Sequence, residues 1–124
     1  MMVLLSRLLY KVEIASVTGN IDVVIKGVTD DSREVSESFV FVCMPAVYDS
    51  PYAHWVYKTD GNEYIADAIK RGAVAIVSQT PMDSVPDGVT YVLVWDARLA
   101  MAKIAAEFYD NPSRKLLVVG VTGT

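Results

Sequence analysis

Short runs of apolar residues recur along the whole chain, and polar turns separate them. Two of these runs, 39–44 and 73–77, are continuously apolar, which is typical of strands covered on both faces of a sheet. The first of them is expected in the interior of the sheet. The complete set of predicted strands is 13–17, 22–28, 39–44, 73–78, 89–95 and 115–121.

Apolar residues at helical spacing predict three helices. The first covers 3–9, and the second covers about 62–71, with Asp60 as its N-cap and Gly72 as its stop. The third begins after Asp96, which caps it. The apolar face of this third helix contains Met101, Ile104, Ala105 and Phe108. Because helices alternate with strands in the second half, we expect an α/β fold: a mixed sheet flanked by helices, with partly parallel pairing.

Polar residues gather after the predicted strand 22–28, in the stretch Thr29-Asp30-Asp31-Ser32-Arg33. A second distinctive stretch, 47–59, is irregular and rich in aromatic residues, and we expect a loop there. Residues 116–124 predict a buried strand that runs into a glycine turn, which is how a phosphate-binding loop begins. A plain strand end with a turn is the alternative. The lysine and the helix that complete such a loop are not in the sequence, so we expect the chain to stop inside that motif.

Length and composition limit the classes of protein to which this chain can belong. A chain of 124 residues suits one domain, and a hydrophobic fraction of 52% excludes a disordered chain. The apolar runs fall far short of the roughly 20 residues of a membrane helix, and the stretch before Arg7 is too short for a signal peptide. We therefore expect a cytoplasmic protein without a membrane partner.

The net charge and the candidate ligating residues argue against nucleic-acid binding, a cysteine nucleophile and a metal site. The net charge is −4 and the Lys and Arg residues are scattered, which argues against nucleic acid but leaves an anionic small ligand possible. The single cysteine, Cys43, lies in an apolar run and is interpreted as a buried thiol rather than a nucleophile. His54 has no neighbours at metal-ligand spacing, so no metal site is predicted.

Three segments together resemble the Mur ligase family, the ATP-dependent amino-acid ligases of peptidoglycan synthesis. The first is 27–35, Gly-Val-Thr-Asp-Asp-Ser-Arg-Glu-Val, followed by Phe-Val-Phe-Val at 39–42; the family has an Asp-Ser-Arg-x-Val loop and a Phe-Val-Ala strand. The second, 59–73, contains Asp60-Gly61 and Tyr64-Ile65 and is similar to the family's Asp-Gly-(His)-x-Phe-Ile helix. The third joins Phe-Tyr-x-x-Pro-Ser at 108–113 to Gly-Val-Thr-Gly-Thr at 120–124, which the family continues as Asn-Gly-Lys-Thr-Thr.

The resemblance implies the family's N-terminal domain. Residues 1–111 would form its uridine-nucleotide-binding domain, and 112–124 would be the linker and first strand of the ATP-binding domain, with Gly123 and Thr124 opening the ATP loop. The full-length enzyme would use ATP and Mg²⁺ to add the third amino acid, meso-diaminopimelate or lysine, to UDP-MurNAc-L-Ala-D-Glu. Its partners would be that substrate and its own central and C-terminal domains. The 124-residue chain itself should have no catalytic residue, no cofactor and no ligase activity.

Four substrate-binding residues are carried over by the resemblance. Asp30 lies where the family's backbone meets the uracil, and Ser32 would offer its hydroxyl to the nucleotide. Lys58 and Thr59 fall where a short family loop meets the nucleotide. Two of these residues have a structural role as the alternative to substrate binding. Ser32 could cap a turn by bonding to nearby backbone, and Lys58 could be a solvated surface residue. Arg33 is interpreted as an ion-pair partner rather than a phosphate ligand.

The sequence departs from the family pattern around the Phe-Val strand. The family usually has Gly before and after this strand, where Glu37-Ser38 and Ala46 stand here, and the loop 47–59 is longer than usual. Its aromatic residues could pack on a neighbouring domain, cover the site or stack on uracil, and we favour packing or a lid. The sister branch that adds the terminal dipeptide shares the first two segments but fits the third less well. A stand-alone nucleotide-sugar-binding module is the other alternative.

Overall fold

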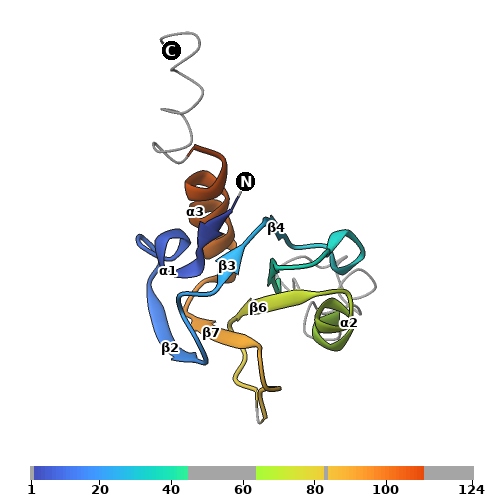
Figure 1. The fold of residues 1–124 in the computed structure, drawn as a ribbon. Helices are drawn as coiled ribbons and strands as arrows, with labels where there is room; N and C mark the ends of the chain where they lie inside the picture. Colours follow the sequence, from blue (N-terminus) through green and yellow to red (C-terminus); the bar gives the residue numbers. More distant parts are fainter. Residues whose placement is uncertain (1, 45–63, 83, 111–124) are drawn as a thin grey trace, which may run out of the picture.

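A computed structural model describes residues 2–44, 64–82 and 84–110 of the chain (Figure 1). Seven strands, three helices and one short 3-10 helix, η1, occur in these ranges. The elements in chain order are β1 Val3–Leu4, α1 Leu5–Leu8, β2 Ile14–Thr18, β3 Val24–Ile25, β4 Gly27–Thr29, η1 Ser32–Glu34, β5 Phe39–Val42, α2 Ile65–Lys70, β6 Ala73–Ser78, β7 Thr90–Val94 and α3 Ala97–Asp110.

Five of the strands form one mixed sheet in the order β2-β7-β6-β5-β4. This confirms the prediction of an α/β fold with a mixed sheet. The four strands from β4 to β7 are parallel neighbours, and β2 pairs antiparallel with β7 at one edge. The remaining strands, β1 and β3, form a separate antiparallel ribbon. Because β4, β5 and β6 are parallel, their carboxyl ends lie at the same edge of the sheet, where open α/β sheets bind their ligands.

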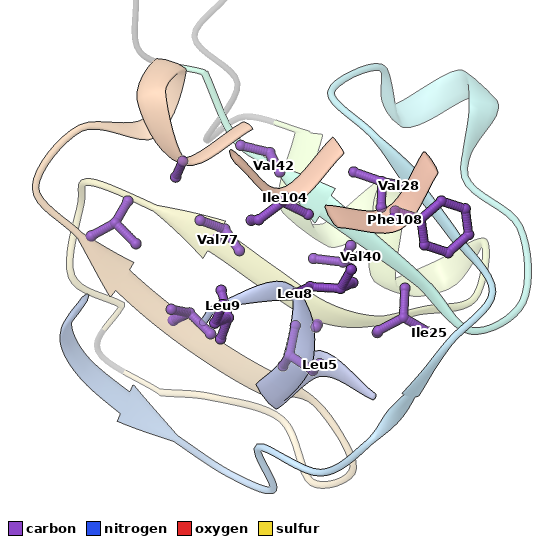
Figure 2. Close-up of a cluster of buried hydrophobic side chains, with 14 of the residues drawn as sticks. Leu5, Leu8, Leu9, Ile25, Val28, Val40, Val42, Val77, Ile104 and Phe108 are labelled. Carbon is purple, nitrogen blue, oxygen red and sulfur yellow. The ribbon is translucent and has the colours of Figure 1, made fainter. Parts of the chain in front are cut away.

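Each face of the sheet carries its own apolar layer. On one face, α1, α3 and the ribbon cover Val40, Val42 and Val77, and Figure 2 shows these side chains directed toward Leu8 and Ile104. On the other face, α2 covers residues that alternate with these along the same strands, such as Phe41 and Ile76. Coverage on both faces is why the strand sequences are continuously apolar rather than alternating.

Most strand predictions are confirmed. The predicted strand 73–78 is β6, the segment 39–44 contains the interior strand β5, and Cys43 directly after it is 2% exposed. The prediction of one strand over 22–28 is wrong. It is divided between β3 and β4, which belong to different sheets, and Lys26 lies between them with its N–H donating to the Ser38 carbonyl at 2.8 Å.

The helix predictions hold in part. Asp96 caps α3, with its Oδ1 accepting from the Leu99 N–H at 3.1 Å, and Ile104 and Phe108 on the predicted face are buried. The helix predicted for 3–9 is wrong at its start, because residues 3–4 pair with β3 as a strand and only Leu5–Leu8 is helical. Tyr64 holds the N-cap position of α2 without a side-chain cap bond, and the predicted cap Asp60 lies outside the described residues. None of the helices in the described ranges is long and apolar enough to cross a membrane.

Two residues with positive φ meet where the chain enters β5 and leaves α2. Gly72 (φ 119°) ends α2 as predicted, and Ser38 (φ 66°) precedes β5. The Ser38 N–H donates to the Gly72 carbonyl at 2.9 Å, so the two turns are joined. Ser38 therefore adopts a backbone conformation that favours glycine.

The strain at Ser38 gives a first prediction. Replacing Ser38→Gly should raise the free energy of unfolding by about 0.5 kcal/mol, since glycine relieves the left-handed strain but adds entropy to the unfolded chain. Urea denaturation measures the change. The matched control is Ser36→Gly, at an exposed residue without positive φ, which should lower stability by a similar amount. Equal effects from both variants would contradict a strained Ser38.

Candidate functional site

A pocket of about 480 Å³ opens at the carboxyl edge of the parallel strands. Residues 30–33 line it directly after β4, and Met44 lines it shortly after β5. Tyr64, at the start of α2, completes the described lining. Three segments far apart in sequence therefore meet here, because β4 pairs with β5 and α2 packs against η1.

Thr29 orders the first segment of this pocket. Its buried Oγ1 accepts from the Asp31 N–H at 3.0 Å and donates to Glu34 Oε1 at 2.8 Å. These two bonds tie the end of β4 to the far end of η1 across five residues. They hold the backbone between them in one conformation, so the pocket wall formed by Asp30 and Ser32 is preorganised.

Asp31 and Arg33 form a paired group on the rim of the pocket. Asp31 Oδ1 accepts from the Arg33 N–H and from Arg33 Nε, each at 3.0 Å, and Oδ2 accepts from Nη2 at 2.9 Å. The interpretation of Arg33 as an ion-pair partner is confirmed. The side-chain bond from Arg33, followed by its backbone N–H, lowers the pKa of Asp31, and the same carboxylate raises the pKa of Arg33.

This ion pair gives a pH prediction. A lowered folded-state pKa means that the Asp31 contribution to stability is complete above about 3.8, the ordinary value, and is lost as the pH falls through the folded value. An NMR titration of the Asp31 carboxyl should therefore give a midpoint below 3.8. Arg33→Gln should return the midpoint toward 3.8, and the control Arg7→Gln should leave it unchanged. A midpoint insensitive to Arg33→Gln would contradict the assignment.

Ser32 has the most unusual environment in the pocket. The residue is part of the pocket lining but is only 6% exposed, and no hydrogen-bond partner for its hydroxyl occurs among the described residues. The alternative role as a turn cap belongs instead to Asp31, whose carboxylate accepts from the Arg33 N–H at the start of η1. A buried hydroxyl without a partner is costly, and a bound ligand could satisfy it.

The structure brings together two of the predicted substrate-binding residues. Asp30 and Ser32 line the same pocket, with the Asp30 side chain exposed at its mouth. Lys58 and Thr59, with the rest of the aromatic segment 47–59, lie outside the described residues, as do Gly123 and Thr124. The predicted linker and last strand lie outside them as well.

Met44 and Tyr64 were not predicted as lining residues. Each carried a signal in the sequence: Met44 ends the apolar run of an interior strand, and Tyr64 stands just before a helix that follows that strand. Charged residues are the usual guide to a site, and neither Met44 nor Tyr64 is charged. Together they give the pocket an apolar and aromatic wall opposite the polar residues 30–33, the mixture that small-molecule sites usually have.

The described ranges contain another hollow but no metal-ligand cluster. No group of three or more His, Cys, Asp and Glu side chains comes together there as a metal ion would require. A larger groove, of about 650 Å³, lies between α1 and the end of α3. None of its lining residues in the described part of the chain is both polar and buried, so the pocket beside Ser32 is the better candidate for a specific ligand.

Sequence comparison links the chain to enzymes of known type. It is 45% identical over 108 residues to the UDP-N-acetylmuramoyl-L-alanyl-D-glutamate--2,6-diaminopimelate ligase of Caldanaerobacter subterraneus, covering 87% of this chain and 20% of the ligase. It is 39% identical over 120 residues to the ligase of the same name from Bacteroides fragilis, covering 97% of this chain and 23% of that ligase. No model of a protein family matches the sequence. The chain thus spans about a fifth of the length of these relatives.

Comparison with solved structures identifies the fold. A crystal structure of MurF from Acinetobacter baumannii superposes with a TM-score of 0.59 at 16% identity, over 86% of this chain and 21% of that one. A second structure from the same organism, of UDP-N-acetylmuramoylalanyl-D-glutamyl-2,6-diaminopimelate--D-alanyl-D-alanyl ligase, gives the same values. At this identity the likeness concerns the fold alone, and it agrees with the fold class predicted from the sequence.

Proposed function

Because the chain belongs to the Mur ligase family, we propose that it forms the N-terminal, uridine-nucleotide-binding domain of a ligase of the MurE type. The complete enzyme would join 2,6-diaminopimelate to UDP-MurNAc-L-Ala-D-Glu in peptidoglycan synthesis. Diaminopimelate is preferred over lysine because both relatives described above are named for it. The domain would comprise residues 1–111, and 112–124 would lead into the next domain.

The pocket at Asp30–Arg33 would hold the uridine diphosphate end of the substrate. The observation that carries this proposal is Ser32, a buried residue of the pocket lining whose hydroxyl has no hydrogen-bond partner in the described part of the chain. A hydroxyl can donate to a uracil or ribose oxygen or accept from a uracil N–H, so a nucleotide would satisfy it. Asp30 would contact the uracil through its backbone, and Lys58 and Thr59 would contact the nucleotide from the following loop.

Holding the substrate by its nucleotide would serve catalysis at a distance. In the complete enzyme, ATP would phosphorylate the substrate carboxylate, and the amine of the added amino acid would then displace phosphate to form the amide. Binding energy at the remote uridine end fixes the reacting carboxylate in place, which turns that energy into rate. The part played by this chain is therefore orientation of the substrate.

ATP and Mg²⁺ would be bound elsewhere in the enzyme. Gly123 and Thr124 would begin the ATP loop, but the lysine that neutralises phosphate charge in such loops is not among the residues 116–124. We therefore expect the 124-residue chain alone to form no amide bond. ATP-dependent amide formation by this chain would contradict that expectation.

A titration with UDP tests the proposed site. Amide NMR of the chain should show shifts concentrated at residues 30–33 and 58–61 on addition of UDP, and again with UDP-MurNAc-L-Ala-D-Glu. Ser32→Ala should weaken UDP binding about fivefold, which corresponds to about one hydrogen bond of 1 kcal/mol. The matched control is Ser36→Ala, an exposed serine outside the pocket, which should leave the affinity unchanged.

Two results would count against this function. If neither UDP nor the complete nucleotide substrate shifted residues 30–33 at millimolar concentration, the pocket would not be the nucleotide site. If Ser32→Ala and Ser36→Ala had equal effects, the hydroxyl would not contact the ligand. Binding of UDP by a full-length protein that forms no amide from diaminopimelate would instead favour the two alternatives, a MurF-type ligase or a stand-alone nucleotide-sugar-binding module.

A further inference from the structure

The ribbon of β1 and β3 is apolar on both of its faces. Its register pairs Val3 with Ile25 and Leu4 with Val24. The first pair is buried in the core beneath α3, at 9% and 0% exposure. The second pair faces outward, at 44% and 42% exposure. A two-stranded ribbon is marginally stable by itself, and an outward pair of large apolar residues adds nothing to the core of this domain.

The outward pair adjoins the groove of about 650 Å³ between α1 and the end of α3. Leu4 lines this groove together with Tyr10, which is 78% exposed. Arg7 and Lys11 give the groove a basic border, and Glu107 lines it from α3. We call Leu4, Tyr10, Val24 and the groove the ribbon face.

The ribbon face lies where the described chain leaves the fold. Figure 1 shows β1 alongside the last turns of α3, with the N-terminus beside the end of that helix. Glu107 stands three residues before Asp110, the last residue of α3. Whatever follows α3 in the polypeptide therefore starts beside this face.

We propose that the ribbon face is the docking surface for the next domain of the same polypeptide. This inference rests on the proposed function, in which the chain is the first domain of a longer ligase. The relatives contain about three to four times as much chain outside the matched stretch as within it. Because α3 ends at Asp110, three residues after the groove residue Glu107, the chain that follows α3 can reach the ribbon face without a long connection. The covering surface would be apolar at its centre, opposite Leu4 and Val24, with carboxylates opposite Arg7 and Lys11.

Hydrogen exchange on the full-length polypeptide and on the 124-residue chain tests the proposal. Amides of residues 3–10 and 23–25 should exchange at least tenfold more slowly in the full-length protein. Amides of β2, at the edge of the main sheet, serve as the reference and should exchange equally in both. Equal exchange at the ribbon face in the two proteins would overturn the proposal.

A pair of substitutions tests the same face without disturbing the ribbon. Leu4→Lys with Val24→Glu removes the apolar surface but keeps a favourable cross-strand pair, because opposite charges face each other in this register. In the full-length protein this double variant should make the segment after α3 at least fivefold more sensitive to limited proteolysis. Leu99→Lys is the matched control, at a leucine of 48% exposure near the other end of α3, and should cause no change.

The outcomes separate this inference from the proposed function. Unchanged proteolysis in the double variant, or concentration-dependent dimers of the 124-residue chain that the double variant abolishes, would overturn docking of the next domain. UDP binding is measured on the same proteins and concerns the pocket beside Ser32. UDP binding without protection of the ribbon face would refute only the docking, and protection without UDP binding would refute only the nucleotide site.

Discussion

Gly72→Ala should lower the free energy of unfolding by about 3 kcal/mol and the Tm by more than about 10 °C. Gly72 has a φ of 119°, which side-chain-bearing residues rarely adopt. A Cβ there would also lie 2.8 Å from the Glu37 Cα and 2.9 Å from the Glu37 nitrogen. Both contacts are with backbone, which cannot rotate away as a side chain could. The free-energy cost of this steric clash therefore adds to the cost of the positive φ.

Gly88→Ala separates these two terms. Gly88 also has a positive φ, of 83°, but nothing lies within 4 Å of a Cβ built on it. This variant should lose only about 1 kcal/mol, the cost of a left-handed alanine. Thermal and urea denaturation of the two variants measure the difference. Equal losses of stability would show that the backbone at Glu37 shifts to accommodate the Cβ. The close contact between Gly72 and Glu37 would then not contribute to stability.

Thr29→Val is expected to lower stability by about 1.5 kcal/mol and to weaken UDP binding about tenfold. Valine keeps the shape of threonine but removes the hydroxyl that joins the Asp31 N–H to the Glu34 carboxylate. Without these bonds, residues 30–33 lose their common anchor and must be ordered when the nucleotide binds, which costs affinity. Denaturation gives the first effect, and NMR or calorimetric titration with UDP gives the second.

Thr90→Val is the control for the second effect. Thr90 is also buried, and its hydroxyl donates to the Asn20 carbonyl at 2.6 Å, far from the pocket. Its loss should cost about as much stability as the loss of the Thr29 hydroxyl and leave the UDP affinity unchanged. If both variants weakened UDP binding equally, the effect at Thr29 would reflect general destabilisation rather than order in the pocket wall.

Elements set by local signals were predicted from the sequence, whereas elements that depend on strand pairing were not. The strand β6 and the start of α3 were predicted closely, because a continuous apolar run and an Asp cap are local signals. The strand expected over 22–28 failed at Lys26, because its two halves pair with strands from different parts of the chain. The pattern of apolar residues in that stretch is the same whichever partner each half has.

Part of the candidate site could likewise be predicted from the sequence, and part of it could not. The polar cluster after β4 was visible in the sequence, and so was the pairing role of Arg33, which has an acid two residues before it. Met44 and Tyr64 were not predicted as lining residues, because only the pairing of β4 with β5 and the packing of α2 against η1 bring them to Ser32. The family pattern added Lys58 and Thr59, whose roles stay predictions.

Composition, periodicity and motif order are properties of neighbouring residues, so the sequence was sufficient for the α/β class, the family and the position of the polar turn after β4. Burial and partner choice are properties of residues brought together from a distance. They required the fold, which removed Ser32 from solvent without giving its hydroxyl a partner in the described chain, turned Leu4 and Val24 outward, and joined Gly72 to Ser38. The physical reason is that hydrogen-bonded pairing and close packing depend on the whole set of contacts around a residue, which a linear pattern does not specify.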